Sequence, residues 1–325
     1  MRIQLQRIDW EYGTPMRLSY RTKTHARTVR VELEDDGLIG RGEGLGVAYH
    51  GETTETISAE LSRFMTVARS GLSRAELQEL LPPGGARNAI DCALWDLEAK
   101  RAGRRAWELL GLADVHRLTT TYTLGIDSPE ALAESAARLR GYSHLKLKMD
   151  GGCDIERVTA VRAARPDVEL VVDANQAWTM QQLRDFAGQL AALDVKLIEQ
   201  PLAVGQDGEL SEFDSPIPLC ADESCQTSRS LSQVAGKYQF VNIKLDKTGG
   251  LTEAVELARR AQAAGLRLMV GCMGGSSLSM APAFVVGQWC EFVDLDGPLL
   301  IKSDMEHAVR YNGSWMSAPE AMLWG

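Results

Sequence analysis

Apolar and polar side chains follow one pattern up to about residue 115 of the 325-residue chain and another beyond it. Residues 28–34 (TVRVELE) alternate between the two classes, as a half-buried strand does. The dipeptide Asp36-Gly37 then predicts a turn into a return strand. Helical spacing of apolar residues follows in three segments: 53–68, 73–81 and 86–101. Strands followed by helices indicate an α+β domain over residues 1–115.

Short apolar runs separated by helix-like stretches fill the second part of the chain. These runs are residues 119–124, 144–149, 168–172, 195–198, 217–220, 240–245, 266–270 and 291–295. Strands that alternate with helices are joined by crossover connections and lie parallel. Eight such strands favour a closed TIM-like barrel, (β/α)7β, over the open doubly wound sheet, which normally has five or six. We therefore expect an α/β barrel over residues 116–299.

Charged residues end most of these runs. The first five of them are Lys148, Asp173, Glu199, Asp222 and Lys244, and Asp294 and Asp296 end the last run. Successive members of the first five are about 22 to 26 residues apart, roughly one strand–helix unit. In a parallel barrel the carboxyl ends of all strands lie on the active-site face. We therefore expect these distant residues to converge, although each alone could simply mark the end of a strand.

The acids and lysines of this set suit a metal-assisted proton transfer. Carboxylates of Asp173, Glu199 and Asp222 would form an all-oxygen site, which suits Mg²⁺ or, alternatively, Mn²⁺. Lys148 and Lys244 would lie on opposite sides of that metal, one as base and the other as acid. The metal would stabilise the charge that forms when a proton leaves the carbon next to a carboxylate. Salt bridges between these acids and lysines are the simpler alternative.

Overall composition and charge limit the classes of molecule that this protein is expected to bind. A net charge of −9 argues against nucleic acid as the main partner but leaves an anionic small molecule open. Neither a leader peptide nor a run long enough to span a membrane is evident, so we expect a cytoplasmic protein without a membrane partner. Six cysteines form no C-x-x-C pair and are expected to be reduced. Asp246 and Lys247 could support the site or lie on the surface.

An ordered series of short motifs resembles the muconate-lactonising subgroup of the enolase superfamily. The motifs are ALWDLEAK (93–100), HLKLKMD (144–150), VVDANQAW (171–178), LIEQPL (197–202), CADES (220–224), NIKLDKTGG (242–250) and FVDLDGP (292–298). The resemblance implies a (β/α)7β barrel under an N-terminal α+β capping domain that the C-terminal tail, about residues 300–325, completes. A homo-oligomer is one alternative for its assembly.

The last two motifs are most similar to those of dipeptide epimerases. That resemblance implies a magnesium-dependent transfer of the α-proton of the C-terminal residue, with L-Ala-D/L-Glu from murein peptides as the expected substrate. It implies that Asp294 and Asp296 bind the ammonium group, that Lys146 binds the carboxylate and that Thr123 lines the pocket. A basic residue of the capping loop would select glutamate, for which we choose Lys23 among several. Backbone contacts are expected at Cys272 and Met273.

Other enzymes on the same scaffold are the main alternatives. N-acyl amino acid racemases, o-succinylbenzoate synthases and cycloisomerases act on substrates without a free ammonium group, which would leave Asp294 and Asp296 without an evident role. A non-catalytic barrel that binds metal and carboxylates is a further alternative. The presence of both Lys148 and Lys244 argues against it.

Overall fold

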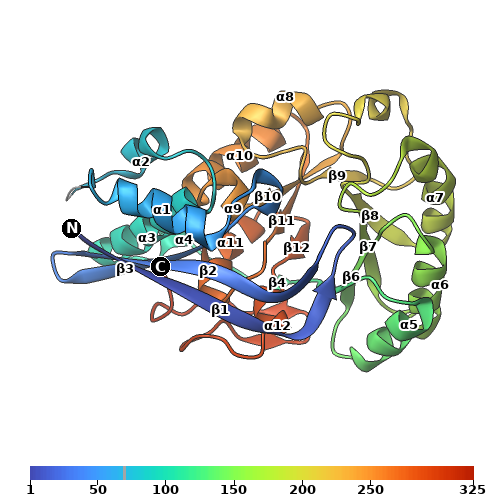
Figure 1. The fold of residues 1–325 in the computed structure, drawn as a ribbon, viewed down its shortest axis with the longest axis horizontal. Helices are drawn as coiled ribbons and strands as arrows, with labels where there is room; N and C mark the ends of the chain where they lie inside the picture. Colours follow the sequence, from blue (N-terminus) through green and yellow to red (C-terminus); the bar gives the residue numbers. More distant parts are fainter. Residues whose placement is uncertain (69–70) are drawn as a thin grey trace.

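The computed structural model describes residues 1–68 and 71–325, and its N-terminal part combines one antiparallel sheet with helices. The sheet strands are β1 (Arg2–Arg17), β2 (Thr22–Asp35) and β3 (Leu38–Leu45). The helices are α1 (Thr54–Phe64), α2 (Arg74–Leu80), α3 (Gly85–Ala102) and α4 (Ala106–Leu109). They lie on the left in Figure 1, beside the barrel. The sequence pattern predicted these elements except β1, α4 and the short 3-10 helix η1 (Ala48–His50).

Helix α3 packs directly on the backbone of β3 because the facing positions of the strand are glycines. A Cβ atom added to Gly40 would lie 2.1 Å from the carbonyl oxygen of Ala93, and one added to Gly42 would lie 2.1 Å from that of Ala89. No side chain fits between the two elements at these points. The close contact buries α3 against the sheet, where Ile90 and Leu97 join its apolar core.

An eight-stranded parallel sheet forms the barrel in the described part of the chain. Its strands are β5 (Tyr122–Leu124), β6 (His144–Lys148), β7 (Glu169–Asp173), β8 (Val195–Glu199), β9 (Leu219–Ala221), β10 (Phe240–Lys244), β11 (Arg267–Gly271) and β12 (Phe292–Asp294). The backbone N–H of Thr121 donates to the carbonyl of Val293 at 2.9 Å, which joins the two ends of the sheet. The predicted TIM-like α/β fold is therefore confirmed.

Helices surround this barrel. They are α5 (Pro129–Arg138), α6 (Asp154–Ala164), α7 (Met180–Ala192), α8 (Leu231–Val234), α9 (Leu245–Thr248), α10 (Leu251–Ala263), α11 (Ser277–Gly287) and α12 (Gly297–Leu300), with the 3-10 helices η2 (Gly208–Glu212) and η3 (Ser228–Ser230). Within the described ranges, no helix combines the length and apolar character needed to cross a lipid bilayer.

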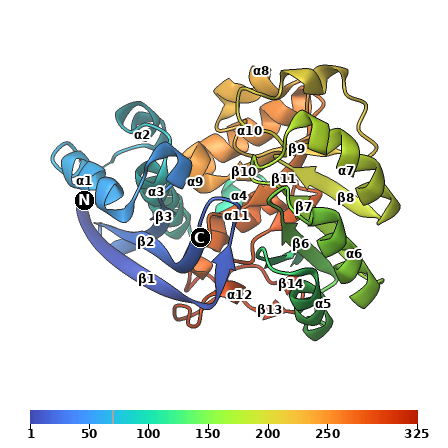
Figure 2. The same cartoon turned by 45° about the vertical axis from the view of Figure 1, so that its right-hand side comes forward.

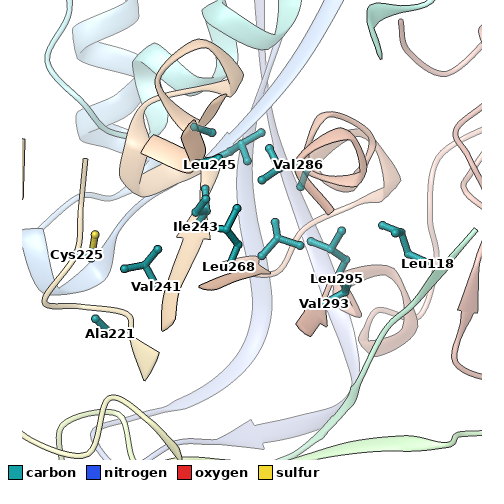
Figure 3. Close-up of a cluster of buried hydrophobic side chains, with 14 of the residues drawn as sticks. Leu118, Ala221, Cys225, Val241, Ile243, Leu245, Leu268, Val286, Val293 and Leu295 are labelled. Carbon is teal, nitrogen blue, oxygen red and sulfur yellow. The ribbon is translucent and has the colours of Figure 1, made fainter. Parts of the chain in front are cut away.

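Side chains alternate between the inside and the outside of the barrel along each strand. Outward-facing residues pack under the helices; in Figure 3, Ile243 and Leu268 of the strands lie near Val286 of α11. Inward-facing residues fill the lower barrel with a separate apolar cluster: Val171, Leu197, Cys220, Phe240, Met269 and Phe292. Two positions further along, five of the six strands carry a polar residue, whereas Gly271 follows Met269: the polar residues are Asp173, Glu199, Asp222, Asn242 and Asp294. Because side chains alternate with a period of two, a layer of charged side chains, called the charged layer below, lies directly above this apolar cluster.

The C-terminal segment returns to both parts of the molecule. Strands β13 (Tyr311–Asn312) and β14 (Trp315–Met316) pair with β4 (Leu118–Thr119) in a small antiparallel sheet. The predicted strand at 119–124 is therefore divided between this sheet and the barrel. Trp324 then donates its indole N–H to the carbonyl of Cys92 on α3 at 2.9 Å. Both termini consequently lie beside the N-terminal part (Figure 2).

Asp246 joins the two parts of the molecule. Its carboxylate accepts hydrogen bonds from the backbone N–H of Leu45 at 2.9 Å and from the amide of Asn88 at 2.7 Å. Both donors belong to the N-terminal part, whereas Asp246 follows barrel strand β10. Burial raises the pKa of this carboxyl to about 7 despite the two hydrogen bonds. A surface position for Asp246 and for the equally buried Lys247 is therefore wrong.

We expect Trp324→Ala to destabilise the protein strongly. The side chain is fully buried, so truncation leaves a cavity and an unpaired carbonyl, at a cost of about 3–5 kcal/mol in the free energy of unfolding. Urea denaturation measures this loss in the free energy of unfolding. Trp315, which is 43% exposed, is the control, and Trp315→Ala should cost less than about 1 kcal/mol. Equal losses in the two variants would contradict the tail contact.

Asp246→Asn should flatten the pH dependence of stability. Because the folded pKa is about 7 and lies above the unfolded value, Asp246 contributes stability below about pH 4 that is lost as the pH rises towards 7. Between pH 5 and pH 8, the wild type should lose on the order of 2 kcal/mol more than the variant. Urea unfolding at both pH values measures this difference. Asp214→Asn, at an exposed position, should behave like the wild type.

Candidate active site

The structure brings the predicted acids and lysines together at the carboxyl ends of the strands. Parallel pairing places Lys148 of β6 beside Asp173 of β7, and Asp173 beside Glu199 of β8. Asp222 follows β9, and Lys244 ends β10. Three strands lie between β6 and β10 in either direction around the barrel, so the two lysines approach the acids from opposite sides.

Each of these lysines pairs with a different acid. The ammonium nitrogen of Lys148 lies 2.5 Å from the Oδ2 atom of Asp173, and that of Lys244 lies 2.7 Å from the Oδ2 atom of Asp222. Burial disfavours the charge of Lys244, but the carboxylates of Asp222 and Glu199 outweigh it and raise its pKa well above the usual value. Both lysines are therefore held by carboxylates on opposite sides of the site.

Lys146 lies beneath these pairs, at the centre of the charged layer. Its side chain is fully buried, and its Nζ atom lies 3.1 Å from Asp173, 2.6 Å from Glu199 and 2.7 Å from Asp294. Burial opposes its charge, but the three carboxylates together raise its pKa well above normal. Lys146 does not line the cleft above, so the structure places it among the acids and away from the cleft surface.

The acids still carry more negative charge than the lysines balance. Burial and the neighbouring carboxylate of Asp173 raise the pKa of Glu199 to about 7. Next to Asp222, burial and the charges of Asp222 and Asp173 raise the pKa of Glu223 to about 8. In both groups the low-dielectric surroundings favour the proton over a further negative charge. An additional cation at this point would relieve the same excess.

The carboxylate oxygens of the site are chemically suited to a hard cation, although in this structure they pair with the ammonium groups of lysines. Within residues 1–68 and 71–325, no three His, Cys, Asp or Glu side chains are gathered as metal ligands. Beside the acids, however, Asn175 Oδ1 and Glu223 Oε2 are buried oxygens without a hydrogen-bond donor. Buried acceptors without donors are costly, and Mg²⁺ prefers such oxygen ligands. The set Asp173, Glu199 and Asp222 is therefore suited to such an ion.

A cleft lies above the charged layer, between the barrel and the N-terminal part. The predicted residues that line it are Lys23, Thr123, Lys148, Asp222, Lys244, Cys272, Met273, Asp294 and Asp296. Asp173, Glu199 and Lys146 contact these residues from below. The structure thus brings the predicted site residues together: some line the cleft, and the others lie directly beneath it.

Two aspartates stand at the end of the last barrel strand. Asp294 accepts a hydrogen bond from the hydroxyl of Thr121 at 2.7 Å, in addition to its ion pair with Lys146. Asp296 accepts from the backbone N–H of Thr123 at 2.7 Å, while burial and the charge of Asp294 raise its pKa to about 7. Both carboxyl groups face the cleft and would attract a positively charged group.

The N-terminal part supplies the opposite wall. Lys23 of β2 donates from its Nζ atom to the backbone carbonyl of Met273 at 3.1 Å. Burial, together with the positive charges of Arg21, Lys148 and Lys244, lowers its pKa to about 7. An anion in the cleft would favour the charged form of Lys23 and so raise its pKa again. Lys23 is therefore placed to attract a negatively charged part of a ligand.

Sequence reasoning missed several residues that line the cleft. They are Tyr12, Met16, Leu18, Tyr20, Tyr49, Asn175, Glu223, Gly274 and Leu300. Asn175 and Glu223 stand one or two positions after predicted ligands, and that proximity was a usable signal. The aromatic and apolar residues of β1 and its turn carry no such signal, because contact with the barrel appears only in the folded molecule.

Lys247 supports the site from below. It is 1% exposed, and its Nζ atom donates to Asp222 Oδ1 at 2.7 Å and to the backbone carbonyls of Cys225 and Asn242 at 2.9 Å each. Asp222 therefore receives one lysine from the cleft side and one from the protein interior. Burial opposes ionisation of Asp222, but Lys244 and Lys247 together hold its pKa below the usual value.

Two family models match the chain. Residues 2–111 match the N-terminal domain of mandelate racemase and muconate lactonizing enzyme, and residues 130–321 match the enolase C-terminal domain-like family. An N-acetyl-D-glutamate racemase from Pseudoalteromonas sp is 43% identical over 298 residues, covering 91% of this chain and 94% of that protein. An L-Ala-D/L-Glu epimerase from Escherichia coli K12 is 41% identical over 304 residues, covering 93% and 95%.

Solved structures agree with these relatives. An enolase family member from Agrobacterium tumefaciens, with homology to dipeptide epimerases and with sodium and L-Ala-L-Glu bound, superposes with a TM-score of 0.96. It is 40% identical and covers 99% of both chains. A dipeptide epimerase from Enterococcus faecalis V583, complexed with Mg and L-Leu-L-Tyr, has a TM-score of 0.89 at 27% identity, covering 98% of this chain and 96% of that one.

Proposed function

This chain belongs to the mandelate racemase and muconate lactonizing enzyme family of the enolase superfamily, and we propose that it is a metal-dependent dipeptide epimerase acting on L-Ala-D/L-Glu. As a racemase or epimerase it is an isomerase. The observation that carries the proposal is the position of Lys148 and Lys244. They line one cleft from opposite sides, with three carboxylates between them. Murein peptides are the proposed source of the dipeptide.

Lys148 and Lys244 would exchange the α-proton of the C-terminal residue of the substrate. A carbon held between the two amines loses its proton to one lysine and receives a proton from the other on the opposite face, which inverts its configuration. A lysine must be neutral to act as the base. Asp222 and Glu199, which raise the pKa of Lys244, therefore have to be compensated by another cation.

Asp173, Glu199 and Asp222 would hold that cation, with Mg²⁺ as our choice and Mn²⁺ as the alternative. When bound, the ion would neutralise the substrate carboxylate and the negative charge that develops as the α-proton leaves. Its charge would also compete with the ammonium groups of Lys148 and Lys244 for the same carboxylate oxygens. Such competition would free the amine of each lysine from its acid, so that it could approach the substrate carbon.

The two walls of the cleft would hold the ends of the dipeptide. Asp294 and Asp296 would receive its ammonium group, which fits their position in the cleft wall and would favour the charged form of Asp296, whose pKa burial and Asp294 raise to about 7. Lys23 would receive the side-chain carboxylate of glutamate, whereas Thr123 would line the pocket with Cys272 and Met273. For Lys146 we propose contact with the substrate carboxylate, which requires its Nζ atom to leave one of its present acids.

A racemase of N-acylated glutamate is the second candidate, favoured by the 43% identical relative. In both candidate substrates the reacting carbon is the α-carbon of a glutamate, so Lys23 could bind the side-chain carboxylate of either one. They differ at the other end, where a dipeptide has an ammonium group and an acylated amino acid has none. The two acids Asp294 and Asp296 support the dipeptide.

We further propose that residues 1–115 with the tail form the capping domain and residues 116–299 the barrel.

Incubation with L-Ala-L-Glu and Mg²⁺ in D₂O should epimerise the C-terminal residue and introduce deuterium at its α-carbon. Lys148→Ala and Lys244→Ala should each lower this turnover at least about 100-fold, because each removes one proton-transfer group. Chiral chromatography and NMR follow the product. Lys196→Ala, at the opposite end of the barrel, is the matched control and should retain full activity.

The same assay separates the two candidate functions. N-acetyl-L-glutamate should turn over with a lower kcat/KM than L-Ala-L-Glu, because it lacks a group for the two aspartates. A higher kcat/KM for the acetylated compound would favour the second candidate. Full retention of epimerisation in Lys148→Ala or Lys244→Ala would remove that lysine from the mechanism.

Removal of divalent metal with EDTA should abolish turnover, and Mg²⁺ should restore it. Mg²⁺ binds the folded chain only, so at 100 times its dissociation constant it should add about 2.7 kcal/mol to the free energy of unfolding. Thermal denaturation measures the resulting shift. Asp222→Asn should lose the shift, whereas the exposed control Asp214→Asn should keep it. Unchanged turnover after complete metal removal would contradict the proposed chemistry.

A further inference from the structure

The segment between β11 and α11 forms a wall of the cleft. Cys272, Met273 and Gly274 line the cleft, and the carbonyl of Met273 accepts the hydrogen bond from Lys23. Gly274 and Gly275 have φ angles of 102° and 106°, in the region that favours glycine. Two consecutive glycines give this loop little stiffness of its own. Contacts from elsewhere must therefore hold its shape.

Glu43 supplies such contacts from strand β3 of the N-terminal part. The side chain is 1% exposed, and its Oε1 atom accepts hydrogen bonds from the backbone N–H of Ser276 at 2.9 Å and from the hydroxyl of Ser279 at 2.7 Å. The hydroxyl of Ser276 lies 3.0 Å from both carboxylate oxygens. A Cβ atom on Gly275 would come within 3.0 Å of the same carboxylate. Glu43 thus contacts the loop at its C-terminal end.

This carboxylate lies at the start of α11, where the helix N-terminus and the donated hydrogen bonds favour its charged form, but burial outweighs them and raises its pKa. Helix N-termini stabilise negative charge, and hydrogen bonds to charged groups are worth more than neutral ones. Burial raises the pKa of Glu43, and the donated hydrogen bonds act in the opposite direction. Asp304 of the C-terminal segment accepts from the backbone N–H of Ser277 at 3.0 Å. Two acids, one from each end of the chain, therefore hold the first turn of α11.

Glu43 does not line the cleft and has no part in the proton transfer described above. We propose that Glu43 is a positioning residue, which holds the loop 272–276 in the shape that completes the cleft wall and so sets substrate affinity. The effect on affinity rests on the proposed function, whereas the effect on the loop does not. Its carboxylate acts through Ser276 and Ser279, and the loop transmits the effect to Met273 and Lys23.

Cys272 reports on the loop independently of catalysis. It is half-buried in the cleft wall, whereas Cys153 is exposed and distant. In Glu43→Gln, the rate of iodoacetamide labelling at Cys272, measured by peptide mass spectrometry, should rise about tenfold or more, the equivalent of a lost hydrogen bond to a charged group. Labelling of Cys153 should not change. An unchanged Cys272 rate in the folded variant would overturn the proposal.

Asp91→Asn is the matched control. Asp91 is also a buried carboxylate of the N-terminal part that accepts a barrel N–H, from Thr252 at 2.9 Å, but it lies on α3 away from the loop. Its substitution should leave Cys272 labelling as in the wild type; equal acceleration in both variants would overturn a specific role for Glu43. Ser279→Ala, which removes one donor and keeps the carboxylate, should accelerate labelling by a smaller factor and serves if Glu43→Gln does not fold.

Kinetics give the second measurement. For L-Ala-L-Glu, Glu43→Gln should raise KM about tenfold and leave kcat within about twofold, because the two lysines are not displaced. A fall in kcat at unchanged KM would overturn the proposal. Failure of the proposed function is distinct: the wild type would then not epimerise the dipeptide, while Cys272 labelling would still decide whether Glu43 holds the loop.

Discussion

The balance of buried charge inside the barrel is the constraint on which the rest of the site depends. Asp173, Glu199 and Asp294 lie in a low-dielectric layer, and each is close to the ammonium group of Lys146. An unpaired charge there would cost several kcal/mol, so acids and lysines can persist only together. The balance is incomplete, as the raised pKa of Glu199 indicates. A bound cation would balance the remaining negative charge.

Much of the barrel and of its charged layer could be predicted from sequence because both follow from local patterns. The eight apolar runs mark the strands, and the period of two indicates which charged residues at or near the ends of these runs face into the barrel. Parallel strands then bring Lys148, Asp173 and Glu199 to adjacent positions. No knowledge of contacts between distant segments was needed for this step.

The N-terminal wall could not be predicted in the same way. Strand β1 has mostly exposed or half-buried side chains, so it lacks the apolar run that identifies a strand. The hydrogen bonds from Ser276 to Glu43 and from Lys23 to Met273 join residues 233 and 250 positions apart. Neither pair has a local pattern that points to its partner. The contacts that build this wall of the cleft are thus the ones hardest to infer from sequence.

The buried contacts across the junction also bear on how a ligand enters and leaves. Asp246 and Glu43 each bind the opposite part of the molecule through hydrogen bonds shielded from water. Lifting the N-terminal part away as a rigid body would break all of these bonds together, at a cost of about 1–3 kcal/mol for each group left unpaired. Moving only the turn between β1 and β2 with its flanking residues breaks fewer bonds, among them those from Lys23 to Met273 and from Ile126 to Arg17. We therefore expect the residence time of a ligand to depend on that turn, while the two parts of the molecule remain joined throughout each catalytic cycle.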